Sequence, residues 1–293
     1  MSKQAGKRPR AAPPAGSNPL RRRTLATLRR HGLLARKTLG QHFLVDEAAL
    51  DRVVAAAGLG PGDTVVEVGP GLGFLTERLA TRAGRVIAVE LDERLAAILE
   101  TTFRDSPKVQ IVRGDVLRLP PARLAGTSRY KVVANLPYYI TSAVMRHFLE
   151  APPRPELMVV TVQKEVAEQI AAPPGRMSLL SVSVQLYGEP EVVAAVPASA
   201  FYPPPEVESA VLKVKVFATP RVPVGDGTGF FAVVRAGFSA ARKQLGNSLA
   251  QGLGLPKEQA LALLAAAGID PRRRAETLAL EEWARLWRAY ADA

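Results

Sequence analysis

A glycine-rich loop directly follows an apolar, β-branched run, and this pairing is the first place where the sequence could bind a ligand. The run covers residues 64–68 and the loop covers 69–73, with glycine at every second position. Glycine allows positive φ and close approach of a ligand to the backbone. A nicotinamide-dinucleotide site would need the spacing G-x-G-x-x-G, and here Phe74 stands where its third glycine would fall. Glu67 precedes the loop, where a carboxylate repels pyrophosphate and attracts a cationic amine.

Two more acidic residues follow the next two predicted strands. Glu90 lies 17 residues after Gly73, where it could accept both ribose hydroxyls, and Asp115 follows the third strand, within reach of an adenine amine. Ligands of open α/β sheets bind at the carboxyl ends of the strands. Acidic residues follow three successive predicted strands, and no lysine that could bind a phosphate lies near them in the sequence. This combination indicates a ligand that is a nucleoside with a cationic tail. We therefore expect S-adenosyl-L-methionine as the cofactor, while the loop alone could be a bare strand-to-helix turn.

The segment Asn135-Leu136-Pro137-Tyr138 ends the fourth predicted strand, and its chemistry fits an exocyclic amino nitrogen. The side-chain oxygen of Asn135 and the carbonyl of Pro137 could bond the two N–H hydrogens of an adenine amine and aim its lone pair at a methyl donor. Tyr138 could stack on the base, which is worth on the order of 1–3 kcal/mol. Rate would come from positioning and electrostatics rather than from a strong base. The alternative is a strand-ending turn with a core tyrosine.

Strand-like and helical patterns alternate along most of the chain, which predicts an α/β fold with a parallel sheet and helices on both faces. The expected strands are 64–68, 85–89, 109–112, 131–134, 157–162 and 207–217. The expected helices among them are 45–57, 74–81, 93–103, 140–149 and 164–171. Beyond Thr219 only helical patterns follow, at 230–238, 243–253, 257–267 and 276–290. We place a domain boundary near residue 218.

Positive charge is concentrated at the start of the chain. The formal net charge is +12, from 39 Lys and Arg against 27 Asp and Glu, and the first 45 residues hold eleven of the basic residues and no acidic one. Residues 1–23 are expected to form a disordered basic arm, because their composition cannot build a core. Such an arm adds salt-dependent phosphate contacts; the alternative is a solubilising tail. An organelle transit peptide fits less well, because prolines disfavour its amphipathic helix.

The composition also argues against several kinds of protein. Cysteine is absent and only three histidines occur, so we expect no disulfide, no thiolate nucleophile and no metal site. No uncharged run reaches the roughly 18 residues of a membrane span, and the start lacks the apolar stretch of a secretory signal. We therefore expect a cytoplasmic protein that does not contact a membrane. A monomer is our separate expectation, which these observations do not establish.

Four motifs occur in an order that one enzyme family shares. They read Gly40-Gln41-His42-Phe43-Leu44, Glu67-Val68-Gly69-Pro70-Gly71-Leu72-Gly73, Asn135-Leu136-Pro137-Tyr138 and Phe201-Tyr202-Pro203-Pro204-Pro205-Glu206-Val207. From about Thr24 to the C-terminus the chain resembles the rRNA adenine N6,N6-dimethyltransferases, in particular the small-subunit (KsgA/RsmA) branch. The resemblance implies a Rossmann-like class I methyltransferase domain at 24–217 and a smaller all-helical, RNA-binding domain at 218–293.

The resemblance also implies a reaction and its residues. Methyl groups would pass from S-adenosyl-L-methionine to N6 of two adjacent adenines near the 3′ end of small-subunit (16S) rRNA, within an assembling small ribosomal subunit. The implied cofactor contacts are Gln41, His42, Leu44, Gly69, Gly71, Glu90, Asp115 and Asn135. The target base would be handled by Asn135, Pro137, Tyr138 and Phe201. His42 departs from the family motif, which usually has Asn there, and both residues can donate a hydrogen bond.

Two assignments keep a plain structural alternative. Phe201 and Tyr202 precede a proline run and could form a packed β-turn instead of closing over the base. Five basic residues of the helical part are candidate phosphate contacts, although solvated helix ends would also explain them. They are Arg242, Lys243, Arg272, Arg273 and Arg274.

Other functions remain open from the sequence alone. A large-subunit methylase that confers macrolide resistance resembles this chain in the first domain, whereas the segment at Phe201 and the Arg-bearing helices favour the small-subunit branch. A DNA adenine methylase would usually show Asp/Asn-Pro-Pro-Tyr/Phe in place of Asn135–Tyr138. A non-catalytic ribosome-assembly factor would have no need of the intact acidic cavity and the Asn135 motif.

Overall fold

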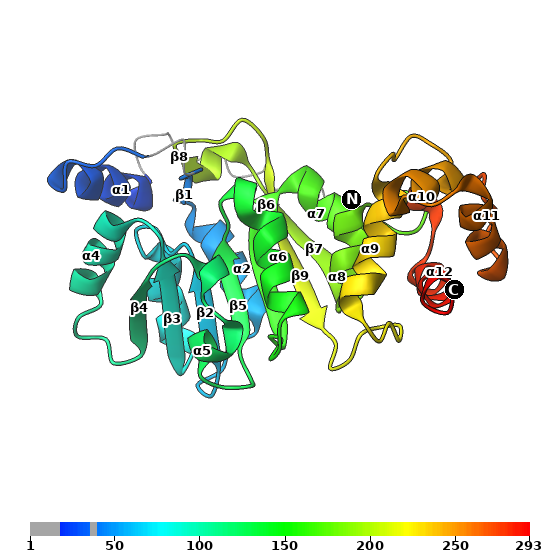
Figure 1. The fold of residues 1–293 in the computed structure, drawn as a ribbon. Coiled ribbons are helices and arrows are strands. Elements are labelled where there is room, and N and C mark those ends of the chain that lie inside the picture. The colour runs from blue at the N-terminus through cyan, green and yellow to red at the C-terminus, as the bar shows by residue number, and fades with distance from the viewer. Residues whose placement is uncertain (1–17, 36–39) are drawn as a thin grey trace, which may run out of the picture.

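The computed structural model describes residues 18–35 and 40–293, which fold around a seven-stranded sheet. The strand order is β4-β3-β2-β5-β6-β9-β7 (Figure 1). The strands are β2 (Thr64–Val68), β3 (Arg85–Glu90), β4 (Val109–Arg113), β5 (Lys131–Asn135), β6 (Leu157–Gln163), β7 (Gly188–Val196) and β9 (Ser209–Val216). A separate two-stranded ladder joins β1 (Phe43–Leu44) to β8 (Phe201–Tyr202).

The expectation of a parallel sheet is wrong for its last two strands. The strands from β4 to β6 pair in parallel, whereas β9 runs antiparallel to β6 and β7 runs antiparallel to β9. The sequence pattern missed β7 because it begins Gly-Glu-Pro-Glu, and Glu and Pro are depleted in strands. The position of Pro190 is consistent with a strand at the edge of the sheet, where a missing N–H does not break a ladder.

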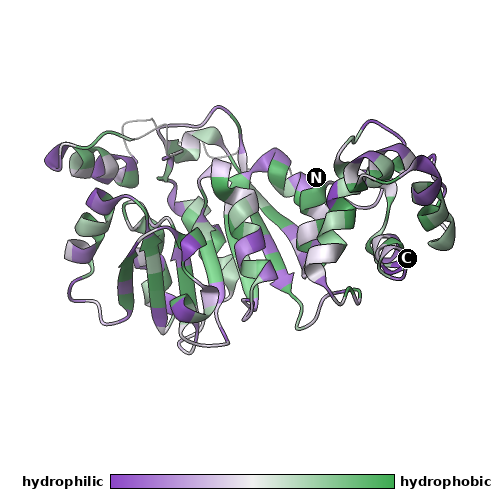
Figure 2. Cartoon of the chain, in the orientation of Figure 1, coloured by the Kyte–Doolittle hydropathy of each residue, from purple (hydrophilic) through white to green (hydrophobic). Residues whose placement is uncertain are grey.

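Helices cover both faces of the sheet, and successive strand residues belong to opposite cores. Val65 packs into the apolar cluster with α2 and α3, whereas Val66 packs into the cluster with α6. This alternation is the period of two that a pleated strand imposes, and the central strands are accordingly hydrophobic over most of their length (Figure 2). The helices of this part are α2 (Glu47–Ala57), α3 (Phe74–Arg82), α4 (Glu93–Thr102), α5 (Pro121–Ala125), α6 (Thr141–Glu150), α7 (Lys164–Ile170) and α8 (Leu179–Gln185).

The first described helix, α1 (Pro19–Arg30), corrects the extent of the basic arm. The Asn18 side chain caps it, and Leu20 and Thr24 are buried. Residues 18–23 therefore belong to the folded part, because an apolar stripe at helical spacing docks them on the α/β sheet domain. The remainder of the expected arm, residues 1–17, lies outside the described residues.

The C-terminal part consists of helices that share a core with the sheet. They are α9 (Gly227–Phe238), α10 (Leu245–Leu253), α11 (Lys257–Ala266) and α12 (Leu280–Ala291), with a 3₁₀ turn at Ala275–Thr277. Phe230 and Trp283 belong to the same apolar cluster as Val66. The architecture therefore changes between Val216 and Gly227, near the expected boundary, while the core continues across it. Among the described residues, no helix is both long and apolar enough to cross a membrane.

Candidate active site

A cavity of about 360 Å³ opens where the order of the parallel strands reverses. The chain proceeds from β2 outward to β3 and β4, and then returns so that β5 lies on the other side of β2. Such a switch point leaves a crevice at the carboxyl ends of the strands, where ligands of open α/β sheets bind. The cavity is lined by the residues that follow β2, β3, β4 and β5, and it is closed from above by residues 40–44.

The glycine loop lines this cavity, and three of its glycines have the left-handed backbone conformation. Gly69, Gly71 and Gly73 have φ values of 68°, 61° and 83°, a region in which residues with a Cβ are strained. A Cβ on Gly71 would lie 3.1 Å from the Phe43 ring, so the loop and the N-terminal segment approach each other too closely for a larger residue. The loop then opens helix α3 at Phe74, as expected.

Glu90 connects the glycine loop to the start of α4. Its Oε2 accepts a hydrogen bond from the Gly71 N–H at 3.0 Å, and its Oε1 accepts one from the Asp92 N–H at 2.9 Å. Burial raises the pKa of Glu90 despite these two backbone bonds. The carboxylate has further lone pairs, so it can still accept hydroxyl groups from a ligand in the cavity.

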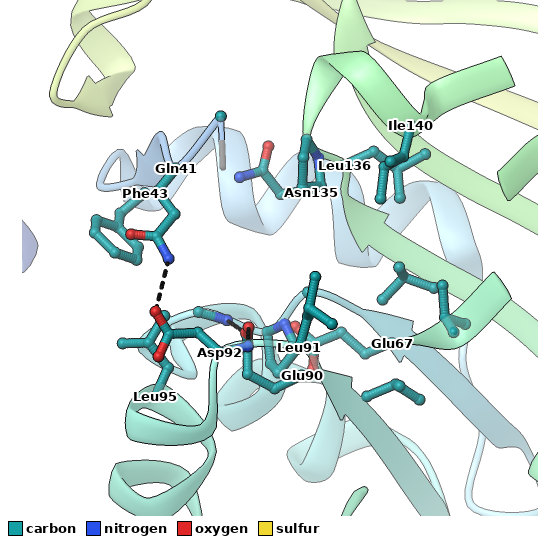
Figure 3. A pocket seen from close by; sticks show the side chains of 18 of the residues that line it. Gln41, Phe43, Glu67, Glu90, Leu91, Asp92, Leu95, Asn135, Leu136 and Ile140 are labelled. Carbon is teal, nitrogen blue, oxygen red and sulfur yellow. Dashed lines mark hydrogen bonds between the residues drawn. The ribbon is translucent and has the colours of Figure 1, made fainter. Parts of the chain in front are cut away.

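Asp92 is a site residue that the sequence reasoning missed. It caps α4 through Oδ1, which accepts from the Arg94 N–H, and its Oδ2 accepts from Gln41 Nε2 at 3.5 Å. Figure 3 shows Gln41 and Asp92 pointing toward each other across the mouth of the cavity, with Glu90 beside Asp92. The available signal was an acid at the N-cap position of a helix that begins directly after a strand.

The expectation of three anionic groups needs a correction at Glu67. Its side chain is 1% exposed and accepts a 2.7 Å hydrogen bond from the Thr76 hydroxyl. Burial raises the pKa of Glu67 to about 8. At pH 7 the carboxyl of Glu67 is therefore mainly protonated and neutral. Asp115 is more exposed, caps the turn after β4 through the Leu117 N–H, and lines the cavity. The anionic side of the cavity is therefore formed chiefly by Glu90, Asp92 and Asp115.

The Asn135 amide is oriented by the N-terminal segment. Its Nδ2 donates a 3.0 Å hydrogen bond to the carbonyl of His42. Because a carbonyl can only accept, the nitrogen must face His42, which leaves Oδ1 of Asn135 available to accept from a ligand. Figure 3 shows Asn135 and Leu136 on one side of the cavity, with Glu90 and Asp92 opposite. The structure therefore brings the two predicted halves of the site together.

The Pro137 carbonyl is less free than expected. It accepts a hydrogen bond of 3.1 Å from the Ile140 N–H in the turn that starts at Tyr138, so only its second lone pair remains. The neighbouring carbonyl of Leu136 accepts no hydrogen bond from any described residue. Both carbonyls are therefore candidates to act with Asn135.

Tyr138 is held on one side by His42. The two rings are stacked with centroids 5.8 Å apart, and the Tyr138 hydroxyl lies 2.6 Å from Ser209 Oγ. His42 Nδ1 lies 2.7 Å from the Pro203 carbonyl, and since a carbonyl only accepts, Nδ1 carries the hydrogen. The predicted contact of His42 with the cofactor stays a prediction, and in this structure the Nδ1 hydrogen is directed at the Pro203 carbonyl.

Phe201 does not lie where the resemblance suggested. It is 3% exposed, it pairs with Leu44 in the β1–β8 ladder, and it is absent from the lining of the cavity. Its ring packs in the same apolar cluster as Leu50 and Val211. Leu44 and Gly69 do line the cavity. In this structure the packed-turn alternative therefore describes Phe201 better than a face for the base.

A family model described as ribosomal RNA adenine dimethylase matches residues 32–292. The chain belongs to the ribosomal RNA adenine dimethylase family. A protein of Dehalococcoides mccartyi named ribosomal RNA small subunit methyltransferase A is 54% identical over 264 residues, which cover 89% of this chain and 90% of the relative. A protein of the same name from Moorella thermoacetica is 49% identical over 91% of this chain and 96% of the relative.

Two solved structures share the architecture. The 23S rRNA methyltransferase ErmE is 31% identical with a TM-score of 0.64 over 84% of this chain and 98% of that chain. A dimethyladenosine transferase from Plasmodium falciparum is 22% identical with a TM-score of 0.72 over 86% of this chain and 98% of that chain. The second likeness shows the fold alone.

The residues of this dimethylase-family chain fit S-adenosyl-L-methionine, the methyl donor of such enzymes. Leu91 is 53% exposed although it is apolar, and it lines the cavity directly after Glu90. An apolar surface beside hydroxyl-accepting carboxylates suits a flat base attached to a ribose. The bent glycine loop leaves room for a ligand against its backbone. Glu90 would hold the ribose, Asp115 the adenine amine, and the loop the remainder of the donor.

The predicted RNA contacts of the helical part divide into two kinds. Arg273 donates to Glu282 at 2.5 and 3.0 Å and to the Thr277 carbonyl at 2.7 Å, so it ties the preceding loop to α12. The prediction that Arg273 contacts RNA phosphates is therefore corrected, because both terminal nitrogens of its guanidinium group already donate hydrogen bonds within the protein. Arg272 and Arg274 are exposed and pair loosely with Asp270 and Glu276 at 3.3 and 3.9 Å. Arg242 and Lys243 are also exposed.

Among residues 18–35 and 40–293, no group of three or more His, Cys, Asp or Glu side chains is arranged to hold a metal ion.

Proposed function

We propose that this chain transfers methyl groups from S-adenosyl-L-methionine to N6 of two adjacent adenines near the 3′ end of small-subunit (16S) rRNA, giving N6,N6-dimethyladenines. Membership of the ribosomal RNA adenine dimethylase family and the names of relatives up to 54% identical support this assignment. The observation that carries it is the meeting of Glu90 and Asn135 at one cavity. A donor seated against Glu90 would face the Asn135–Tyr138 segment.

The donor supplies a methyl group activated by its sulfonium charge, and the chain supplies position. Asn135 Oδ1 accepts one N–H of the target amine, because its Nδ2 is engaged with His42. The carbonyl of Leu136 or the second lone pair of Pro137 accepts the other. Two acceptors placed in this way draw the amine away from conjugation with the ring and direct its lone pair into the cavity. Preorganised acceptors of this kind need no reorganisation during reaction.

Tyr138 provides a face for the target base. His42 stacks on one side of its ring and Ser209 holds its hydroxyl. The opposite side of the ring is proposed to stack on the base. A base that stacks there has to leave its stacking and pairing partners in the RNA. The free energy needed for this is lower in an RNA loop than in a duplex. Stacking returns on the order of 1–3 kcal/mol of that cost.

The partner that we propose is the rRNA of an assembling small ribosomal subunit, met in the cytoplasm by a monomer of this chain that uses no metal. The exposed residues Arg242, Lys243, Arg272 and Arg274 are proposed to contact phosphates, within an RNA-binding helical domain that covers 218–293. Arginine suits this task because its planar fork matches phosphate geometry.

Transfer of a labelled methyl group to isolated small and large subunits tests the assignment. We expect label in small-subunit rRNA only, from subunits that lack the modification beforehand. Label in large-subunit rRNA would favour the activity named for ErmE, to which the chain is 31% identical. No label in either RNA, from protein that binds the donor in calorimetry, would overturn the proposal.

A further inference from the structure

Helix α1 carries a concentration of positive charge that the proposed active site does not use. Five of its twelve residues are arginine, and none is acidic. The helix ends before residue 32, where the match to the family model begins. Its role is therefore not given by the family match and has to be read from its contacts.

The inner face of α1 fixes it rigidly to the sheet domain. Leu20, Thr24 and Leu28 are buried, and Asn18 Nδ2 donates to the Val45 carbonyl at 2.8 Å. Arg23 lies over the Phe74 ring, 4.9 Å from its centroid. The same Arg23 forms two hydrogen bonds with Glu77 of α3, at 2.6 and 3.2 Å.

The anchored helix lies at the rim of the catalytic cavity. Arg21 lies 5.7 Å from the centroid of the Tyr202 ring. Tyr202 pairs with Phe43, the residue that follows His42. Figure 1 shows α1 beside the β1–β8 ladder, at the edge of the molecule where β2 and β3 end. The charge of α1 is therefore held beside Phe43 and Phe74, which line the cavity.

The outer face of α1 presents unpaired guanidinium groups. At 100° per residue, Arg22 and Arg29 fall on the side opposite the stripe of Leu20, Thr24 and Leu28. Both arginines are exposed, and within the described part of the chain neither has an ion-pair partner. Because the apolar stripe is already buried, this helix has no apolar face with which to enter a lipid surface.

We propose that α1 is an RNA-binding surface, on which Arg22 and Arg29 bind phosphates of the rRNA strand that leads to the target adenines. The proposal rests on the proposed function. An Arg fork binds phosphate oxygens in a bidentate way, and phosphate contacts set the register of a nucleic acid without reading its sequence. The helix thus holds the strand beside the cavity, while the Asn135 segment selects the base.

A charge-matched pair of double variants tests the contact. Arg22→Gln with Arg29→Gln removes two charges from α1. Arg104→Gln with Arg123→Gln removes two exposed charges that precede β4 and β5 in the chain. They lie toward the amino ends of these strands, away from the carboxyl ends at which the cavity lies. Each lost single-strand phosphate contact reduces the slope of log affinity against log salt by about 0.7. We expect the α1 variant to lose about 1.4 in slope and about tenfold in affinity for small subunits, and the control to lose neither.

Cross-linking locates the strand without changing the charge. The chain has no cysteine, so Ala26→Cys places a single thiol on the outer face of α1, and Ala122→Cys places one on α5 as the control. A thiol-tethered cross-linker on Cys-bearing α1 should join nucleotides next to the methylated adenines, and the α5 control should not. Equal salt slopes for both double variants, or cross-links from α5 alone, would overturn the inference. Wild-type protein that binds RNA but transfers no methyl would instead contradict the proposed function. The salt slopes and the cross-links would still test the RNA contact of α1, because neither measurement depends on methyl transfer.

Discussion

Asn135 and His42 are joined by a hydrogen bond of 3.0 Å from the side-chain Nδ2 of Asn135 to the backbone carbonyl of His42, across 93 residues of sequence. This contact turns the acceptor oxygen of Asn135 away from His42 and makes it available to a target amine. The ring of His42 also stacks on Tyr138. One residue of the N-terminal segment therefore positions both side chains that would handle the base.

Asn135→Ala should abolish methyl transfer. The variant loses the acceptor that orients the amine, and removal of one preorganised hydrogen-bonding group of this kind costs about 10²–10³ in rate. Affinity for RNA should stay within a few-fold, because Asn135 contacts no phosphate. Single-turnover transfer of labelled methyl to reconstituted subunits measures the first, and filter binding the second. Gln110→Ala, which removes an amide on exposed β4, is the control, and near-normal product from the Asn135 variant would contradict the assignment.

Glu90→Ala should weaken binding of S-adenosyl-L-methionine by tenfold or more, about 1.4 kcal/mol or greater. The variant loses the acceptor for the ribose and also frees the backbone N–H groups of Gly71 and Asp92. Calorimetry with the donor measures the effect, and RNA affinity should not change. Unaltered donor affinity in a correctly folded variant would place the ribose elsewhere.

Glu67 should make the free energy of unfolding depend on pH. Burial raises its pKa from the ordinary 4.5 to about 8, so between these values the folded chain keeps a proton that the unfolded chain has released. Stability from this group is complete below pH 4.5, falls as pH rises, and levels off above about pH 8. Glu67→Gln is neutral throughout and can still accept from Thr76.

The difference in unfolding free energy between Glu67→Gln and the wild type should therefore grow across that window, by on the order of 3–5 kcal/mol. Glu90, whose pKa burial also raises, is present in both proteins, so most of its own titration cancels in the comparison. Its charge also contributes to the raised pKa of Glu67. Denaturant titrations at several pH values measure this difference. A difference that does not change with pH would show that Glu67 is ionised in the folded chain.

Much of the fold followed from local pattern. Alternating β-branched runs and helical spacings placed the five parallel strands to within one or two residues. The central strands β2, β3, β5 and β6 are mostly buried and read as largely apolar runs. The edge strand β7 could not be predicted in this way, since Glu189 and Glu191 on it face solvent. Its place depends on the ladder with β9, which no local pattern specifies.

The candidate site was predicted in position more than in detail. Glu90, Asp115 and Asn135 follow strands whose carboxyl ends meet, so topology alone brings them together. The errors concern contacts with residues far along the chain. Phe201 is buried because it pairs with Leu44, and Arg273 is engaged because Glu282 lies beside it. Neither contact could be inferred from residue type and spacing.

Substitution of Arg273 should lower stability, whereas substitution of its neighbours Arg272 and Arg274 should lower RNA affinity. Arg273→Gln removes a charged hydrogen-bonded pair with Glu282 and should cost about 1–2 kcal/mol of unfolding free energy. Arg272→Gln combined with Arg274→Gln should leave stability nearly unchanged, because both pairs are exposed, and should reduce RNA affinity. Thermal unfolding and filter binding of all three proteins measure the contrast. Indistinguishable behaviour of the single and double variants would contradict the division.

The most direct measurement is mass mapping of methylated adenines in small-subunit rRNA after unmodified subunits are incubated with this protein and S-adenosyl-L-methionine. We predict two neighbouring N6,N6-dimethyladenines near the 3′ end, four methyl groups in all, and none with Asn135→Ala. Methylation at another nucleotide, at a single adenine, or only in large-subunit RNA would contradict the proposed function.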